Sequence, residues 1–201
     1  MLNEDHYNIS FNNIKDMLSV RKITIQSIED KVDDINFLVK IINNDIIVLY
    51  NKQDSFLIAT VRTIKQHIKD SIKDSKKSLV LLICITDPNI KQQKLIELQD
   101  DELSNIKFEY HTLHSTIINP IKCKLQPKFT ILNDDEIYMI IDKYQLKSKY
   151  KLPIINIKDP IAKYYGLEKG NVIKCIRQYE DENGHKIISN NNNGNFYRVC
   201  L

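Results

Sequence analysis

Hydrophobic positions in the N-terminal part of this 201-residue chain follow first a helical and then a strand-like spacing. Residues 11–20 and 23–32 carry apolar side chains at helical intervals, which predicts two amphipathic helices. The runs 37–42, 46–50 and 55–61 are short, rich in β-branched or aromatic residues and separated by polar turns. This pattern predicts a small meander of three strands.

The pattern becomes helical again from residue 63, where isoleucines recur at every fourth position in Ile64, Ile68 and Ile72. Residues 78–85 form a nearly continuous apolar run, typical of a strand buried on both faces of a sheet. A polar break at 86–89 begins another helix that extends through residue 98, and strands are predicted at 106–110 and 115–118. We therefore expect a small α/β domain with a mixed sheet.

Capping signals dominate the C-terminal part. Asn133 precedes a helix and has Glu136 at the reciprocal position of a capping box. Asp159 and Pro160 begin a second, short helix, and Gly166 ends it.

Extended segments are predicted around these two helices. An edge strand is expected at 152–155, and strands at 172–177 and 196–201 flank a hairpin turn at Asn183-Gly184. We leave the polar tract 190–193 without regular structure.

Composition supports a division into two domains. All four glycines lie in the last 36 residues, and the formal net charge of +3 arises entirely in residues 125–201. We therefore predict an α+β/α/β protein with an N-terminal α/β domain at 1–122 and a small α+β domain at 123–201. Isoleucine, asparagine and lysine together contribute 79 residues, which indicates an AT-rich genome.

No catalytic constellation is expected. The strand that follows Asp45 in this interpretation offers neither the carboxylate nor the lysine of a metal-dependent nuclease, and His111 and His114 have no acidic or thiol partner at ligand spacing. The first 165 residues contain no glycine for a phosphate-binding loop. The four cysteines are widely spaced, the polar N-terminus does not look like a secretory signal, and no apolar run could span a membrane. We thus expect no metal, no cofactor and no membrane partner.

A row of lysines accompanies the isoleucines of the helix that begins near residue 63. Lys65, Lys69 and Lys73 are spaced by four, and Lys91 follows the next strand. Such a row is either the solvated face of an amphipathic helix or a surface that contacts phosphates without reading bases. Interleaved acidic residues leave both interpretations open.

The C-terminal motif resembles a known family. It runs Asp159-Pro160-Ile161-Ala162-Lys163-Tyr164-Tyr165-Gly166-Leu167, continues through Gly170, Val172, Lys174 and Ile176-Arg177, and ends at Tyr197-Arg198-Val199. This order resembles the fifth subunit of eukaryotic-type multisubunit RNA polymerases and its archaeal counterpart. The resemblance covers residues 117–201, and residues 60–95 are more weakly similar to part of the family's N-terminal jaw domain. The chain departs from the family at Cys123, where a histidine is usual.

The resemblance implies a non-catalytic subunit without cofactors. Its C-terminal domain would dock on the largest polymerase subunit, near the sixth subunit, through Pro153, Asp159, Pro160, Tyr164, Tyr165, Gly166, Arg177, Tyr197 and Arg198. Its N-terminal jaw would contact downstream duplex DNA non-specifically through Thr86, Pro88, Asn89, Lys65, Lys69, Lys73 and Lys91.

The divergence of the N-terminal domain and the AT-rich composition favour a large DNA virus as the source. The expected location is then the virion and the host cytoplasm, or the nucleus if the source is a cellular eukaryote. Two alternatives are a stand-alone nuclease-like enzyme that processes nucleic acid and a free DNA-binding adaptor. The adaptor would bind weakly, because the net charge is only +3.

Overall fold

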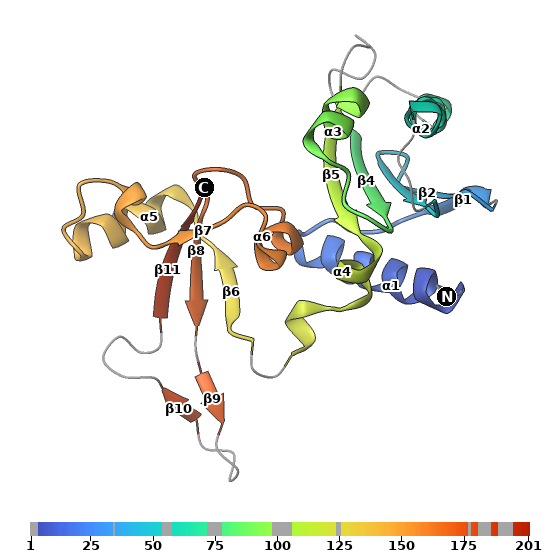
Figure 1. Cartoon of the computed structure of the whole chain (residues 1–201). Helices are drawn as coiled ribbons and strands as arrows, with labels where there is room; N and C mark the ends of the chain where they lie inside the picture. Colours follow the sequence, from blue (N-terminus) through green and yellow to red (C-terminus); the bar gives the residue numbers. More distant parts are fainter. Residues whose placement is uncertain are drawn as a thin grey trace. The chain divides into compact units, whose positions relative to one another are not determined.

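The computed structural model divides the chain into two compact units, Met1–Ile118 and Asn119–Leu201, each built around its own sheet (Figure 1). It describes residues 4–33, 35–53, 58–71, 78–97, 106–123, 126–176, 178–180, 186–188 and 195–201. The mixed α/β class predicted from the sequence is confirmed, and the division falls a few residues before the predicted boundary at 122/123. Among the described residues, no helix combines the length and apolar character needed to cross a bilayer.

The N-terminal unit contains a five-stranded sheet in the order β1-β2-β3-β4-β5. Its strands are β1 (Ile28–Asp33), β2 (Phe37–Ile42), β3 (Ile46–Asn51), β4 (Ser78–Cys84) and β5 (Ile106–Thr112). The first three strands form antiparallel pairs, whereas β3, β4 and β5 run parallel to one another. The sheet is therefore mixed, and its central strands are the apolar runs that the sequence identified.

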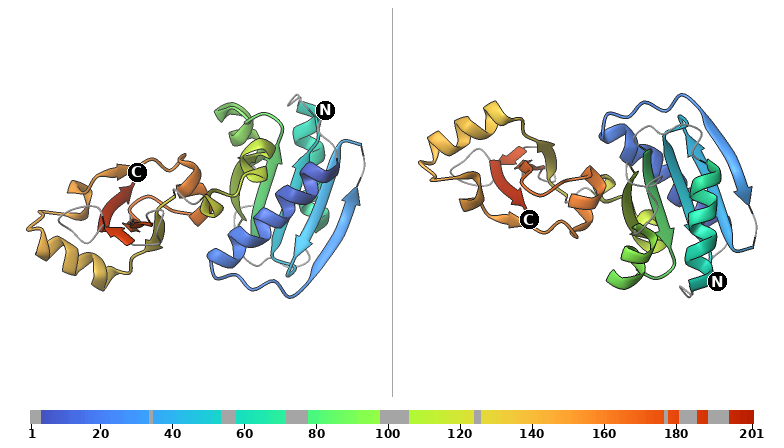
Figure 2. Two further views of the ribbon diagram at one scale, coloured as in Figure 1. Left: turned by 90° about the horizontal axis from the view of Figure 1, so that it is seen from below. Right: turned by 90° about the horizontal axis from the view of Figure 1, so that it is seen from above.

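Helices cover both faces of this sheet (Figure 2). The helices α2 (Ile58–Ser71) and α3 (Ile90–Glu97) connect the parallel strands and lie on one face, as right-handed crossovers in one direction require. The helices α1 (Glu4–Val20) and α4 (Leu113–Ile117) contact one another on the opposite face. The sheet is thus the middle layer of a three-layer unit.

Successive residues of β3 pack against helices on opposite faces of the sheet. Ile47 and Leu49 of β3 pack with Ile64 and Ile68 of α2, all of them at most 1% exposed. Tyr50, one position further along β3, points to the opposite layer and meets α1. The period of two along the strand thereby gives each helical layer its own core.

A buried hydroxyl network fastens α1 to the rest of the unit. The Ser10 hydroxyl lies 3.1 Å from the Tyr50 hydroxyl and 2.7 Å from the Thr116 hydroxyl of α4. The Asn13 side-chain amide donates to the carbonyls of Thr116 and Ile117 at 2.9 and 2.6 Å. Burial raises the pKa of Tyr50, so its hydroxyl stays protonated throughout the physiological range.

The C-terminal unit has a four-stranded sheet in the order β6-β8-β11-β7. Its strands are β6 (Lys128–Ile131), β7 (Ile154–Ile155), β8 (Val172–Ile176) and β11 (Asn195–Cys200), and β7 is the one that pairs in parallel within it. A separate antiparallel pair consists of β9 (Gln178–Glu180) and β10 (Lys186–Ile188). The helical segments are η2 (Pro120–Lys122), α5 (Asp134–Lys143), η3 (Lys149–Lys151) and α6 (Pro160–Tyr165). The predicted turn at Asn183-Gly184 and the tract 190–193 lie outside the described residues.

This sheet also separates two small cores. One lies on the α6 side and includes Ile161, Ile173 and Cys200, while the other lies on the α5 side and includes Val172 and Val199. Neighbouring residues of β8 and of β11 therefore enter different cores, as strand geometry requires.

The predicted helix caps of the C-terminal unit are confirmed. Asn133 and Glu136 form a reciprocal capping box with distances of 2.8 and 2.9 Å. The Asp159 carboxylate accepts a hydrogen bond from the Ile161 amide at 2.8 Å, and Gly166 ends α6 in the left-handed region with φ 63°. These local interactions fix both ends of a helix only six residues long.

Three predicted elements of the N-terminal unit are wrong. The helix predicted at 23–32 is absent: residues 23–27 have no regular structure, and residues 28–33 form β1, because pairing with β2 overrides the apparent helical spacing. Residues 58–61 of the predicted strand 55–61 belong to α2, and residues 55–57 lie outside the described part. The segment 115–118 lies in and just after α4, where Thr112 caps the helix by accepting from the Ser115 amide at 3.2 Å.

Candidate functional site

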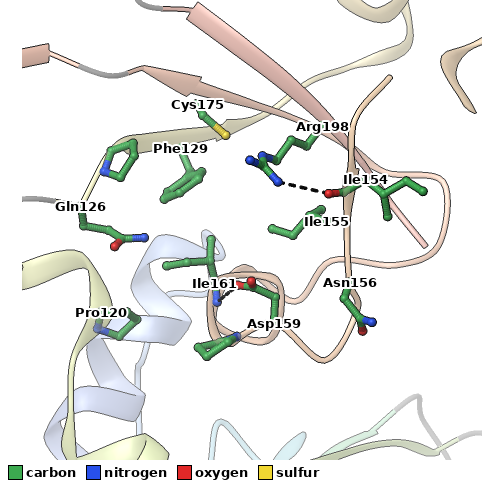
Figure 3. Close-up of a pocket in the computed structure, with 12 residues that line it drawn as sticks. Pro120, Gln126, Phe129, Ile154, Ile155, Asn156, Asp159, Ile161, Cys175 and Arg198 are labelled. Atoms are coloured by element: carbon green, nitrogen blue, oxygen red, sulfur yellow. Dashed lines mark hydrogen bonds between the residues drawn. The ribbon is translucent and has the colours of Figure 1, made fainter. Parts of the chain in front are cut away.

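A groove of about 530 Å³ on the C-terminal unit is its main candidate binding site (Figure 3). Phe129 of β6, Ile155 of β7 and Ile161 of α6 supply its apolar lining. Pro120 of η2 and Pro160 at the start of α6 also line it, so four elements of the unit meet here. An apolar lining of this kind suits the side chains of a docked polypeptide segment.

Polar groups stand around this lining. The Arg198 guanidinium donates to the Ile154 carbonyl at 3.2 Å, and Asn156 and Asp159 lie along the same side of the groove (Figure 3). Ile154 itself is 56% exposed on the edge strand β7. A partner segment would therefore find apolar contacts in the groove, with a cation and a carboxylate at its margin.

The structure brings three of the predicted docking residues together in this groove: Asp159, Pro160 and Arg198. Pro153 is exposed immediately before β7. Gly166 ends α6, so its role in the structure is the left-handed turn.

The aromatic docking residues lie elsewhere. Tyr164 is one of the predicted docking residues, but it is only 6% exposed and packs within the unit, which corrects its expected position. Tyr165 is half-buried against Phe129, with ring centroids 5.9 Å apart. Tyr197 packs on Tyr144 in the α5-side core, hence on the face of the sheet opposite to the groove. Arg177 lies outside the described residues.

Three of the lysines predicted to face DNA belong to the α2–α3 layer of the N-terminal unit. Lys65 and Lys69 are half-buried on α2, and Lys91 is exposed in the first turn of α3. The helices α2 and α3 contact one another, so the layer is continuous. Lys73 lies outside the described residues.

The loop before α3 is ordered by a second capping box. The Gln92 amide donates to the Asn89 side chain at 3.0 Å, and the Asn89 amide donates to the Gln92 side chain at 2.8 Å. Thr86 and Asn89 are exposed as a contact surface requires, but Pro88 is buried, which corrects its expected position. The Pro88 carbonyl accepts from the Gln93 side chain at 2.9 Å, so this residue supports the loop.

A largely buried charge cluster escaped sequence reasoning. Arg21 follows α1 and approaches Glu109 of β5 at 2.9 and 3.1 Å, and both side chains are at most 15% exposed. His111 lies 3.6 Å and Lys107 lies 3.8 Å from the same carboxylate. Burial alone would raise the pKa of Glu109, but the nearby His111 ring and Arg21 guanidinium outweigh it and lower the pKa to about 2.

The alternation of charged and apolar residues along β5 is the sequence pattern that could have predicted this cluster. Lys107, Glu109 and His111 occupy every second position and so share one face of the strand. The cluster ties the end of α1 to the edge strand β5 and has a structural role. Across the described residues, no group of three histidine, cysteine or acidic side chains is arranged to hold a metal ion.

Comparisons with known proteins agree with the motif of the C-terminal unit. Residues 118–188 match the family model described as RNA polymerase Rpb5, C-terminal domain. The chain is similar to subunit 5B of DNA-directed RNA polymerases IV and V from Arabidopsis thaliana, with 35% identity over 108 residues that cover 54% of this chain and 47% of the relative. It is also similar to subunit 5A of DNA-directed RNA polymerase V from the same plant, with 32% identity and coverage of 62% and 54%.

A relative from Dictyostelium discoideum extends the matched region. The rpabc1 subunit of its DNA-directed RNA polymerases I, II and III is 28% identical over 144 residues, which cover 70% of this chain and 66% of the relative. The chain spans about half the length of the two plant relatives.

Proposed function

We propose that this chain is a member of the RNA polymerase Rpb5 family and a non-catalytic fifth subunit of a multisubunit DNA-directed RNA polymerase. The observation that carries the proposal is the match of residues 118–188 to the family's C-terminal domain. Most of the matched segment lies within the unit that contains the apolar groove. Polymerase subunits 5 from a plant and from an amoeba share sequence with the chain, which supports the same assignment.

In this proposal the C-terminal unit docks on the largest polymerase subunit, beside the sixth. The groove supports it because three of the docking residues expected from the sequence, Asp159, Pro160 and Arg198, line one surface with apolar side chains between them. A docked segment would bury Ile154 and Phe129 and satisfy the charges at the groove's margin. The arginine side chain also braces the edge strand through the Ile154 carbonyl.

Affinity purification of the tagged chain from its native source tests this docking. The two largest polymerase subunits should copurify with the unmodified chain, and Arg198→Glu should lower their recovery at least tenfold. Lys128→Glu is the matched control, because Lys128 is exposed one position before Phe129 and therefore points away from the groove side of β6. Absence of the large subunits from the unmodified purification would refute the assignment, and equal loss with both variants would refute the groove as the docking surface.

The N-terminal unit is proposed to act as a jaw over downstream duplex DNA. The exposed loop residues Thr86 and Asn89 and the lysines of the α2–α3 layer support this part, since non-specific DNA binding needs positive charge rather than base recognition. In the assembled polymerase, the K65Q/K69Q variant should weaken downstream duplex binding and reduce its salt slope by about 2, which is roughly 0.9 for each phosphate that is no longer neutralised. The K15Q/K22Q variant removes the same charge from α1 and the turn after it, and should leave the slope unchanged. Equal slopes for all three proteins would refute the jaw assignment.

The source is proposed to be a large DNA virus, with the protein in virions and the host cytoplasm. The abundance of isoleucine, asparagine and lysine supports an AT-rich genome. Mass spectrometry of purified virions and of nuclei from uninfected cells distinguishes the two locations. Detection of the chain in uninfected nuclei would refute the viral source.

A further inference from the structure

A lysine-rich segment links α5 to the edge strand β7 of the C-terminal unit and has no role in the groove. Residues 144–151 contain three lysines and no acidic residue. Lys147 and Lys151 are exposed, and Tyr150 between them is 56% exposed, although its ring is large and largely apolar. The segment ends in η3, which holds Lys149, Tyr150 and Lys151 in a single tight turn.

The fold places Gly170, which follows Lys169 in the sequence, beside this turn. Gly170 has φ 89°, and a Cβ atom at this position would lie 3.4 Å from the Lys149 ammonium and 3.5 Å from the Tyr150 hydroxyl. The turn that contains Lys169 and Gly170 therefore packs directly under Lys149 and Tyr150. Lys169, the residue before Gly170, is exposed. We call Lys147, Lys149, Tyr150, Lys151 and Lys169 the basic patch.

Among the described residues, no ion pair of a basic-patch lysine with an acidic side chain is seen. Other lysines are paired: Lys40 lies 2.6 Å from Asp30, and Lys52 lies 2.8 Å from Asp33. Lys149 instead makes a cation–π contact, with its ammonium group 5.7 Å from the centre of the Tyr150 ring. Clustered like charges repel one another, and a partner that supplies several negative charges would relieve this repulsion.

We propose that the basic patch binds single-stranded nucleic acid. Lysine ammonium groups contact phosphates as point charges and carry no sequence information, so the binding is independent of sequence. The exposed Tyr150 ring offers a base a surface on which to stack, and only an unpaired strand can present a base in this way. This site goes beyond the proposed polymerase function and does not depend on it, because its residues are separate from the docking groove and from the α2–α3 layer.

Fluorescence anisotropy of the full chain with a labelled oligothymidine of about 20 nucleotides tests the proposal. At about 50 mM salt, K147A/K151A/K169A should bind at least tenfold more weakly than the unmodified chain, and its salt slope should fall by about 2, or roughly 0.7 for each phosphate left without its lysine. Y150A should weaken binding about fivefold or more, as expected when one base–aromatic stack is removed. Thermal melting of each variant checks that its folding is intact.

A matched control removes the same charge elsewhere on the unit. Lys122, Lys128 and Lys158 are exposed outside the patch, and K122A/K128A/K158A should bind within about twofold of the unmodified chain. Equal losses with the patch and control variants would overturn the proposal, because binding would then depend on net charge alone. Competition by duplex DNA as strong as by the single strand would also overturn it, and so would a Y150A variant with unchanged affinity. Failure of the chain to copurify with a polymerase would bear on the proposed function and not on this result.

Discussion

Replacing Glu109 with glutamine removes the charge that partners Arg21 and keeps the shape of the side chain. Both side chains are largely buried, so the arginine would be left in the protein interior without its counter-charge. A carboxyl group whose pKa falls from 4.5 to about 2 on folding contributes roughly 3 kcal/mol of stability at neutral pH. Breaking a buried ion pair by removing one partner costs about 3–5 kcal/mol, which agrees with this figure. We therefore expect E109Q to lower the free energy of unfolding of the N-terminal unit by about 3 kcal/mol.

Urea unfolding of the full chain, monitored by hydrogen exchange and mass spectrometry, measures the loss of unfolding free energy separately in each unit. Peptides from β3, β4 and β5 should exchange at lower urea in E109Q, whereas peptides from α5 and β8 in the other unit should not change. E29Q is the matched control, because Glu29 is exposed on the edge strand β1 and the substitution is chemically the same.

A double variant separates the ion pair from general damage to the core. R21M/E109Q removes both charges, and it should recover a large part of the stability that E109Q loses, since no uncompensated buried charge remains. An E109Q variant as stable as E29Q would contradict the reasoning. A double variant no more stable than E109Q would contradict it as well.

Three further outcomes follow from the structure. Because folding lowers the pKa of Glu109, its contribution is present above the unfolded value of about 4.5 and is lost as the pH falls towards 2, so acid titration of the N-terminal unit should be steeper in the unmodified chain than in E109Q. D159A should destabilise the C-terminal unit by about 1 kcal/mol through loss of the α6 cap, and D159N, which can still accept the hydrogen bond, should restore most of it in urea unfolding. Among the four free cysteines, the exposed Cys123 alone should react rapidly with a thiol reagent in the native protein, because burial shields Cys84, Cys175 and Cys200, and denaturation should release all four.

The C-terminal unit was the more predictable part of the fold because its signals are local. Asn133 and Glu136 lie three residues apart, and Asp159, Pro160 and Gly166 mark both ends of one short helix. In each case the interacting groups are neighbours in the sequence, so the pattern contains both partners. Strand β6 was not predicted, because four residues carry too little periodicity to be recognised.

Long-range pairing explains the errors in the N-terminal unit. Residues 28–33 have the spacing of a helix, but they form β1 because β2 offers a paired edge. The charge cluster was missed for the same reason, since Arg21 and Glu109 are 88 residues apart. The groove was partly foreseen, because the motif contained Asp159 and Arg198, but the hydrogen bond between Arg198 and the Ile154 carbonyl joins residues 44 positions apart.

The contact between Ser10 and Thr116 can form only late in the synthesis of the N-terminal unit, because the two residues are 106 positions apart. A ribosome that adds about 5–20 residues per second needs roughly 5–20 s to synthesise the intervening chain. During this interval α1 has been made but α4, which it must meet, has not. Ser10 and Asn13 of α1 therefore emerge well before the α4 residues that they contact. The nascent chain should depend on chaperones most strongly over this interval.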